Sequence, residues 1–109
     1  MNSDSSVKKQ GKGDNRPVNS EEARAIVLAG LGCVDMVVIY DDETPLEVIK
    51  MLEPAVIAKG ADYDANETDT SSKKYIVGSK EVKANGGEVL AIPLVDGFST
   101  TAIIEKMNA

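Results

Sequence analysis

The chain has 109 residues, 42% of them hydrophobic, and its 12 Lys and Arg against 18 Asp and Glu give a net charge of −6. This is the length of one domain. The absence of His excludes Ser-His-Asp and Cys-His nucleophile pairs and imidazole metal ligands, and the single Cys excludes a disulfide framework and a cysteine zinc site. An acidic chain has no excess of cations to neutralise phosphates along a duplex, so we expect no nucleic acid partner.

The first half of the chain predicts an arm followed by a helix, a strand and a second helix. Residues 1–19 are polar and mildly basic, and their glycines and proline predict a loop or arm. A serine cap followed by two glutamates predicts a helix over 20–31. The nearly continuous apolar run 34–40 predicts a strand buried on both faces, as in parallel sheets. A Thr-Pro start and a proline stop predict a helix within 44–54.

The second half of the chain predicts two strands and two helices around a polar loop. In chain order these are a strand over 55–59, an exposed loop over 62–74, a helix over 79–85, a strand over 88–92 and a helix over 99–107. The last helix is expected to turn Ile103, Ile104 and Met107 toward the core. Strands separated by helices pair in parallel through right-handed crossovers. The predicted fold class is therefore α/β, an open parallel sheet with helices on both faces.

Polar clusters follow all three predicted strands, and ligands of open α/β sheets bind beyond the carboxyl ends of the strands. The acidic run 41–43 is interpreted as a solvated loop rather than a metal site. After the third strand, Gly97 leads into Ser99, Thr100 and Thr101 at the start of a helix. Backbone N–H groups, hydroxyls and the positive helix end suit a phosphate there, or one hydroxyl simply caps the helix.

Five further residues are candidates for binding. Lys59 beside Gly60 could meet a phosphate or remain a solvated surface group. Asp62 and Tyr63 could bind the hydroxyls of a ribose or sugar, or form an ordinary turn. Arg16 could bind an anion in bidentate fashion or belong to a surface arm.

No membrane or leader segment is apparent in the sequence. No apolar stretch approaches the roughly 18–20 residues that span a bilayer. The residues after Met1 lack a basic region followed by an apolar one. We therefore expect no membrane contact and a cytoplasmic location. Cys33 is expected to be a small buried hydrophobic residue.

An ordered set of short segments resembles one family of enzymes. In chain order the segments are 2–4, 12–19, 33–35, 43–45, 59–63, 78–82, 85–89 and 97–101. Together they resemble the nucleotidyltransferase (cytidylyltransferase-like) superfamily, and within it the adenylyltransferase domains of ADP-heptose synthases. The resemblance implies a Rossmann-like fold. It also implies adenylyl transfer from ATP to D-glycero-β-D-manno-heptose 1-phosphate, with Mg²⁺, in the synthesis of lipopolysaccharide core precursors.

The resemblance also implies roles for individual residues. The implied nucleotide-binding residues are Lys59, Gly60, Asp62, Tyr63, Gly97, Ser99, Thr100 and Thr101. Asn2, Asp4 and Arg16 are implied to lie near the second substrate, the sugar 1-phosphate. The His-x-Gly-His motif of the family has no counterpart in a chain without His. We therefore expect an N-terminally truncated domain, with residues 1–19 as an arm near the site and residues 20–109 as the C-terminal part of a single nucleotidyltransferase domain.

Two other functions remain open at this point. The chain could be a non-catalytic, truncated relative that retains nucleotide or phosphate binding, or a cytidylyltransferase of the glycerol 3-phosphate type. A parallel sheet without its first strand would expose an edge and an apolar helix face. We therefore expect a marginal or aggregation-prone monomer, or a chain that completes its sheet with a missing N-terminal half or with a second copy.

Overall fold

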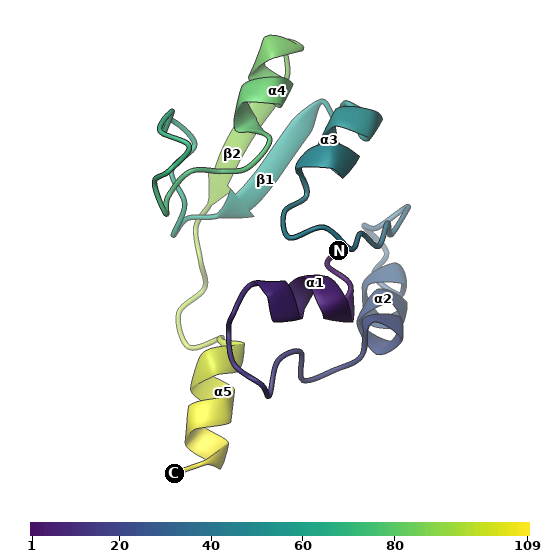
Figure 1. Ribbon diagram of the computed structural model, residues 1–109, viewed down its shortest axis with the longest axis vertical. Coiled ribbons are helices and arrows are strands. Elements are labelled where there is room, and N and C mark those ends of the chain that lie inside the picture. Colours follow the sequence, from purple (N-terminus) through teal and green to yellow (C-terminus); the bar gives the residue numbers. More distant parts are fainter. The chain divides into compact units, whose positions relative to one another are not determined.

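The computed structural model describes residues 1–109, which divide into two compact units, residues 1–54 and 55–109 (Figure 1). The first unit contains α1 (Asp4–Lys9), α2 (Glu21–Ala29) and α3 (Leu46–Leu52), and the second contains β1 (Val56–Gly60), α4 (Ser79–Ala84), β2 (Glu88–Ile92) and α5 (Thr100–Met107). The helices and the parallel strand pair confirm the predicted α/β class. None of the helices has the length and apolar character that crossing a membrane requires.

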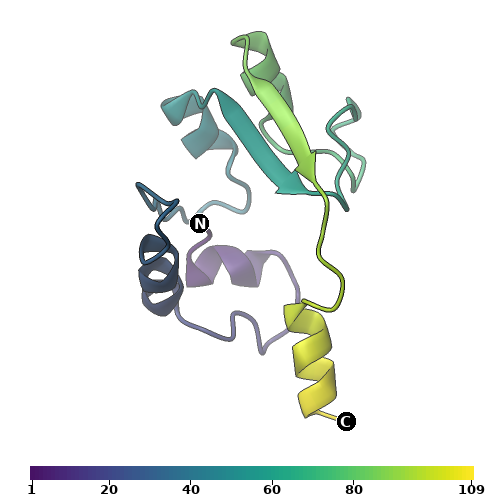
Figure 2. The same ribbon diagram turned by 180° about the vertical axis from the view of Figure 1, so that it is seen from behind.

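The second unit is built on a parallel pair of strands joined through a helix. β1 and β2 pair in register from Val56 with Glu88 to Gly60 with Ile92. α4 lies between them in the sequence and packs against both strands (Figure 2). Val82 of α4 and Ile76 just before it are the buried apolar side chains of this core. Parallel pairing places the carboxyl ends of both strands at one edge of the sheet.

The polar loop between β1 and α4 is closed at its base and tied to α4. The N–H of Asp64 donates to the carbonyl of Lys74 at 2.9 Å, and Asp64 forms an isolated parallel bridge with Tyr75. Lys83 of α4 donates through Nζ to the carbonyl of Ala65 at 2.6 Å. The predicted exposed loop is thus held at its base and by a side chain of α4.

The first unit contains a helix where the sequence predicted only an arm. α1 begins after Ser3, whose Oγ accepts the N–H of Ser6 at 3.1 Å, and Asp4 stands in its first turn. A hydroxyl cap and an early carboxylate both stabilise the positive end of a helix. Gly11 and Gly13 have positive φ and follow the helix, so they end it rather than prevent it.

The predicted strand over residues 34–40 is wrong. Its one bridge is a parallel pairing of Tyr40 with Asn2. The N–H of Ser3 donates to the carbonyl of Tyr40 at 2.9 Å, and the N–H of Tyr40 donates to that of Met1 at 3.1 Å. A strand needs a partner along its whole length, and this apolar run has one only at its end. The sheet therefore has two strands instead of three. The prediction that Cys33 is buried is also wrong, because this residue is exposed.

Apolar side chains of the helices remain largely uncovered. Ile26 of α2 is 73% exposed, and Met107 of α5 is 80% exposed. The prediction that α5 turns its apolar face into a core is wrong for Ile103 and Met107, while Ile104 is half-buried. The sequence periodicity marks an apolar face correctly, but burial also requires a second surface that covers it.

Candidate functional site

The carboxyl end of β1 forms the first cluster of candidate residues. Lys59 and Gly60 are the last two residues of the strand, and the N–H of Tyr63 donates to the carbonyl of Gly60 at 3.0 Å. This turn brings the Nζ of Lys59 to 4.8 Å from the centroid of the Tyr63 ring, a cation–π arrangement. The ring holds the ammonium group in place, while Lys59 itself remains exposed to solvent.

Gly60 stands where two other side chains approach the backbone closely. A Cβ placed on Gly60 would lie 2.9 Å from Oδ1 of Asp62 and 2.9 Å from Cδ2 of Leu94. Both distances are shorter than a Cβ tolerates, so any larger residue would push these side chains aside. Glycine therefore lets the turn after β1 come into contact with the segment that follows β2.

The start of α5 forms the second cluster. Ser99 caps the helix, and its Oγ accepts the N–H of Ala102 at 3.2 Å. Gly97 turns the chain into the helix with φ of 87°, a left-handed conformation that favours glycine. Thr100 and Thr101 are exposed in the first helical turn. The Ser99 hydroxyl keeps its own proton available to a ligand while it accepts the capping bond.

A cavity of about 380 Å³ lies at the start of α5. Residues 94–99 and Ala102 line this cavity. Leu94 belongs to that lining and is also the residue that approaches Gly60. Leu94, which the sequence analysis did not single out, is the residue that links the turn after β1 to this lining.

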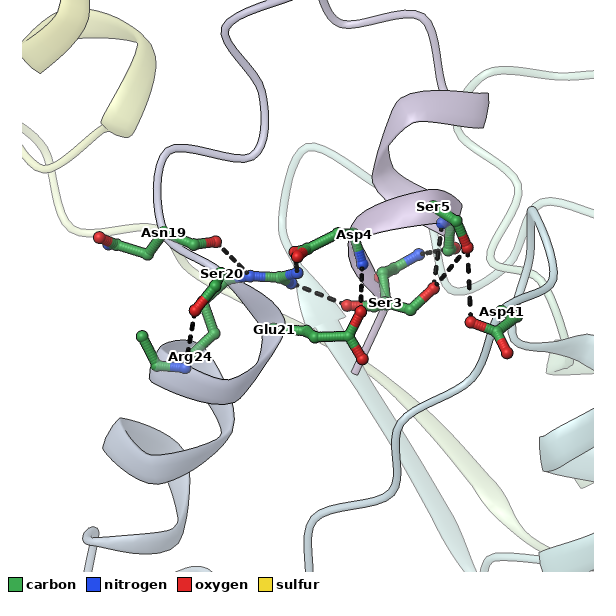
Figure 3. A network of polar contacts seen from close by, with 11 residues as sticks. Ser3, Asp4, Ser5, Asn19, Ser20, Glu21, Arg24 and Asp41 are labelled. Carbon is green, nitrogen blue, oxygen red and sulfur yellow. Dashed lines mark hydrogen bonds and ion pairs between the residues drawn. The ribbon is translucent and has the colours of Figure 1, made fainter.

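In the first unit, Asn2 and Asp4 lie in a polar network centred on Arg24 (Figure 3). Arg24 forms an ion pair with Asp4 at 2.7 Å and donates to the backbone carbonyls of Asn2 at 2.8 Å and Asn19 at 3.0 Å. The N–H of Asp4 donates to Oε1 of Glu21 at 3.2 Å. Arg24 thus fixes the candidate residues Asn2 and Asp4 onto α2.

Serines of α1 connect the same network to residues 41 and 42. Ser5 donates to Oδ1 of Asp41 at 3.4 Å and shares a hydrogen bond with Ser3 at 3.0 Å. Buried Ser6 donates to the carbonyl of Asp42 and accepts from the side-chain amide of Asn2 at 3.0 Å. The acidic run after residue 40 therefore packs on α1.

Arg16 lies in the loop between α1 and α2 and is partly buried. Its N–H donates to the carbonyl of Gly13 at 3.2 Å. Its peptide bond to Pro17 is cis.

Two groups of the first unit have shifted pKa values. Burial raises the pKa of Tyr40, and the hydrogen bond from Asn2 offsets only part of that rise. Burial, and then the charge of Arg24, lower the pKa of the Met1 amine, which donates to the carbonyl of Val38 at 2.6 Å. Neither group belongs to the predicted binding residues.

The side chains of both clusters suit phosphate binding better than proton transfer. Lysine, hydroxyls and backbone N–H groups neutralise or hydrogen bond to phosphate oxygens without exchanging protons near pH 7. Nowhere in residues 1–109 do three or more Cys, Asp or Glu side chains gather closely enough to hold a metal ion. The Mg²⁺ that the family resemblance implies therefore finds no site made by these residues alone.

Arg24 is the residue of the network that the sequence analysis missed. The helical pattern of residues 20–31 placed it on a helix, but its three partners lie 5 to 22 residues away in the sequence. Asn19 directly precedes α2, whereas Asn2 and Asp4 are brought to Arg24 by the tertiary fold. The one signal in the sequence is an arginine in a segment otherwise rich in alanine and glutamate.

Comparison with known proteins places this chain in a class. The family model described as cytidylyltransferase-like matches residues 1–106, so the chain belongs to the cytidylyltransferase-like family of nucleotidyltransferases. The Rossmann-like α/β arrangement agrees with that family.

The chain is similar to curated proteins named bifunctional protein HldE. It is 47% identical over 106 residues to the protein of Rhodopseudomonas palustris strain HaA2 and 49% identical over 106 residues to that of Hyphomonas neptunium. It is 46% identical over 109 residues to that of Bradyrhizobium sp. strain ORS 278. These matches cover 97–100% of this chain but 20% of each relative, so the chain spans about a fifth of their length.

Proposed function

We propose that this chain takes part in adenylyl transfer from ATP to D-glycero-β-D-manno-heptose 1-phosphate. The products are ADP-heptose and pyrophosphate, and ADP-heptose serves lipopolysaccharide core synthesis. The family membership and the HldE relatives support nucleotidyl transfer. The observation that carries the proposal is that Leu94 approaches Gly60 in the turn after β1 and also lines the cavity before α5.

In this proposal the reaction is an in-line displacement at phosphorus. A phosphate oxygen of the sugar 1-phosphate forms a bond to the α-phosphorus of ATP, and the bond from that phosphorus to the β-phosphate oxygen breaks as pyrophosphate leaves. Such reactions depend on positioning and on neutralisation of charge. Lys59 neutralises phosphate charge, and Ser99, Thr100 and Thr101 hold the triphosphate at the start of α5.

The remaining predicted residues complete the binding sites. Gly60, Asp62 and Tyr63 line the nucleotide pocket, with Gly97 turning the chain into it. Asn2, Asp4 and Arg16 lie near the sugar 1-phosphate, where the ion pair with Arg24 orients Asp4. Mg²⁺ would accompany ATP, held through its phosphates. Because all substrates and products are water-soluble, we propose a cytoplasmic location.

A second candidate function is nucleotide binding without catalysis. The observation that favours it is the absence of His, because the family resemblance assigns triphosphate binding to a His-x-Gly-His motif. Loss of one preorganised charge-stabilising group lowers a rate by about 10²–10³. An in-frame His-x-Gly-His coding sequence upstream of Met1 would favour the enzyme, and its absence would favour the binding module.

Titration of the chain with ATP and with CTP tests the proposed site. We expect ATP to shift the backbone amide resonances of Gly97, Ser99 and Thr100 and to bind more tightly than CTP. Lys59→Ala should weaken ATP binding about three- to fivefold at low salt and less at high salt, because solvent ions screen an exposed charge. The control Lys80→Gln, an exposed lysine of α4, should bind ATP like the wild type.

Other outcomes would change the proposal in defined ways. Release of pyrophosphate with CTP and glycerol 3-phosphate, but not with ATP and the heptose 1-phosphate, would favour the cytidylyltransferase alternative. ATP shifts confined to residues outside the turn after β1 and the start of α5 would refute the site.

A further inference from the structure

Lys59 is an exposed cation that contacts an aromatic ring and no carboxylate. Its Nζ lies 4.8 Å from the centroid of the Tyr63 ring. It forms no ion pair with the neighbouring Asp62, and it donates no side-chain hydrogen bond. An ion pair would cancel the charge of the ammonium group, whereas a ring attracts the cation through its quadrupole and leaves the net charge in place. The Lys59 ammonium group therefore has a preferred position and keeps its charge and its N–H donors for a ligand.

The backbone around Tyr63 makes the ring the fixed member of this pair. The N–H of Tyr63 donates to the carbonyl of Gly60 at 3.0 Å, and the N–H of the next residue, Asp64, donates to the carbonyl of Lys74 at 2.9 Å. Tyr63 is half-buried, whereas Lys59 is exposed. A lysine side chain by itself samples many rotamers, so contact with an anchored ring restricts where its ammonium group lies. The ring thus positions the lysine, and not the reverse.

The strand fixes the other end of the pair. Lys59 pairs in register with Ala91 of β2, so its backbone is part of the sheet. Gly60 then allows the tight turn, since a Cβ at this position would lie 2.9 Å from Oδ1 of Asp62. The backbones of the lysine and the tyrosine therefore both belong to hydrogen-bonded structure, and only the lysine side chain between them is free to move.

We propose that Tyr63 is a positioning residue that acts on a bound polyphosphate through Lys59. The face of its ring holds the ammonium group of Lys59 at the carboxyl end of β1 before the ligand arrives, so less side-chain entropy is lost on binding. The inference rests on the proposed function, in which Lys59 neutralises phosphate charge. It gives no role to the hydroxyl of Tyr63, in contrast to the alternative in which this residue binds the hydroxyls of a ribose or sugar.

The first test is a measurement on the wild-type chain. Protons above the face of an aromatic ring are shielded, so we expect the ε-methylene protons of Lys59 to resonate upfield of those of Lys80, an exposed lysine of α4. Tyr63→Phe should keep this shift, and Tyr63→Leu should abolish it. Tyr75→Leu removes another half-buried tyrosine at the base of the same loop and should keep the shift. Wild-type Lys59 resonances at the position of those of Lys80 would overturn the inference.

The second test is a double-mutant cycle in ATP binding at low ionic strength. Tyr63→Leu should weaken binding about two- to fivefold, the effect of an exposed cation–π contact, while Tyr63→Phe and Tyr75→Leu should bind like the wild type. With Lys59→Ala already in place, Tyr63→Leu should have no further effect, because the ring then has no cation to position. A merely structural Tyr63 would weaken binding by the same factor in both backgrounds. Equal losses in Tyr63→Phe and Tyr63→Leu would assign the contact to the hydroxyl and overturn the inference.

Inorganic tripolyphosphate, titrated as a second probe, separates this inference from the function on which it rests. If Lys59→Ala weakens ATP binding and Tyr63→Leu does not, the inference fails and the proposed function stands. If tripolyphosphate binding depends on Lys59 and Tyr63 as described but ATP does not bind, the inference stands and the proposed function fails. If neither compound binds, both fail.

Discussion

Arg24 should contribute more to stability than any exposed ion pair of this chain, because one guanidinium group of α2 holds residues 2–4 and Asn19 together. It pairs with Asp4 at 2.7 Å, with 24% and 35% of the two side chains exposed. Solvent screens such a partly exposed pair, so its coupling free energy should be about 1 kcal/mol. The two hydrogen bonds to the carbonyls of Asn2 and Asn19 add about 1 kcal/mol each. Arg24→Met should therefore lower the free energy of unfolding by about 2–3 kcal/mol.

A double-mutant cycle in urea, followed by circular dichroism, measures this coupling. The single variants are Arg24→Met and Asp4→Asn, and the double variant completes the cycle. Glu47 and Lys50 of α3 supply a matched control, because their pair at 3.1 Å is 65% and 48% exposed. Its coupling should be about 0.3 kcal/mol. A coupling for Asp4 and Arg24 no larger than that of the control, or an unchanged unfolding midpoint for Arg24→Met, would refute the reasoning.

Three further outcomes are expected. Thr100→Val should weaken ATP binding about three- to tenfold without lowering the unfolding midpoint, and Thr101→Val should weaken it by a similar factor, since each removes one hydroxyl hydrogen bond to the phosphates; unchanged affinity in a titration would remove the phosphate role. Burial raises the pKa of Tyr40, so stability should be complete below pH 10 and fall as pH rises through the folded pKa. In an alkaline titration followed by tyrosinate absorbance, the component that appears at the highest pH should therefore be missing in Tyr40→Phe, and its persistence would contradict this. The uncovered faces of α2 and α5 should make the chain self-associate on size-exclusion columns, and a monodisperse monomer with a cooperative melt would contradict that.

Local signals in the sequence predicted most elements of the second unit to within one or two residues. Ser99 caps α5 as its position before two threonines suggested, and β1 ends at Gly60. The exposed loop before α4 is also irregular as expected. These features depend on residues within a few positions of one another, so short-range chemistry is sufficient to predict them.

Features that depend on distant partners could not be predicted in the same way. The apolar run 34–40 has strand composition, but its pairing depends on a partner that composition does not reveal, and only Tyr40 has one. Gly11 and Gly13 favour an irregular arm in the sequence, whereas the structure has α1 begin at the cap residue Ser3 and end before these glycines. Within the candidate sites, Arg24 and Leu94 are defined by tertiary contacts alone.

The closed base of the loop between β1 and α4 makes this segment a natural place to lengthen the chain. Its ends are held by two hydrogen bonds that do not involve the tip, one from Asp64 to Lys74 and one from Lys83 to Ala65. Doubling the length of such a flexible loop costs only about 0.6 kcal/mol in closure entropy. An epitope or fluorophore-binding peptide grafted near Thr70 would therefore report on the protein without disturbing the strand pair that supports the candidate site.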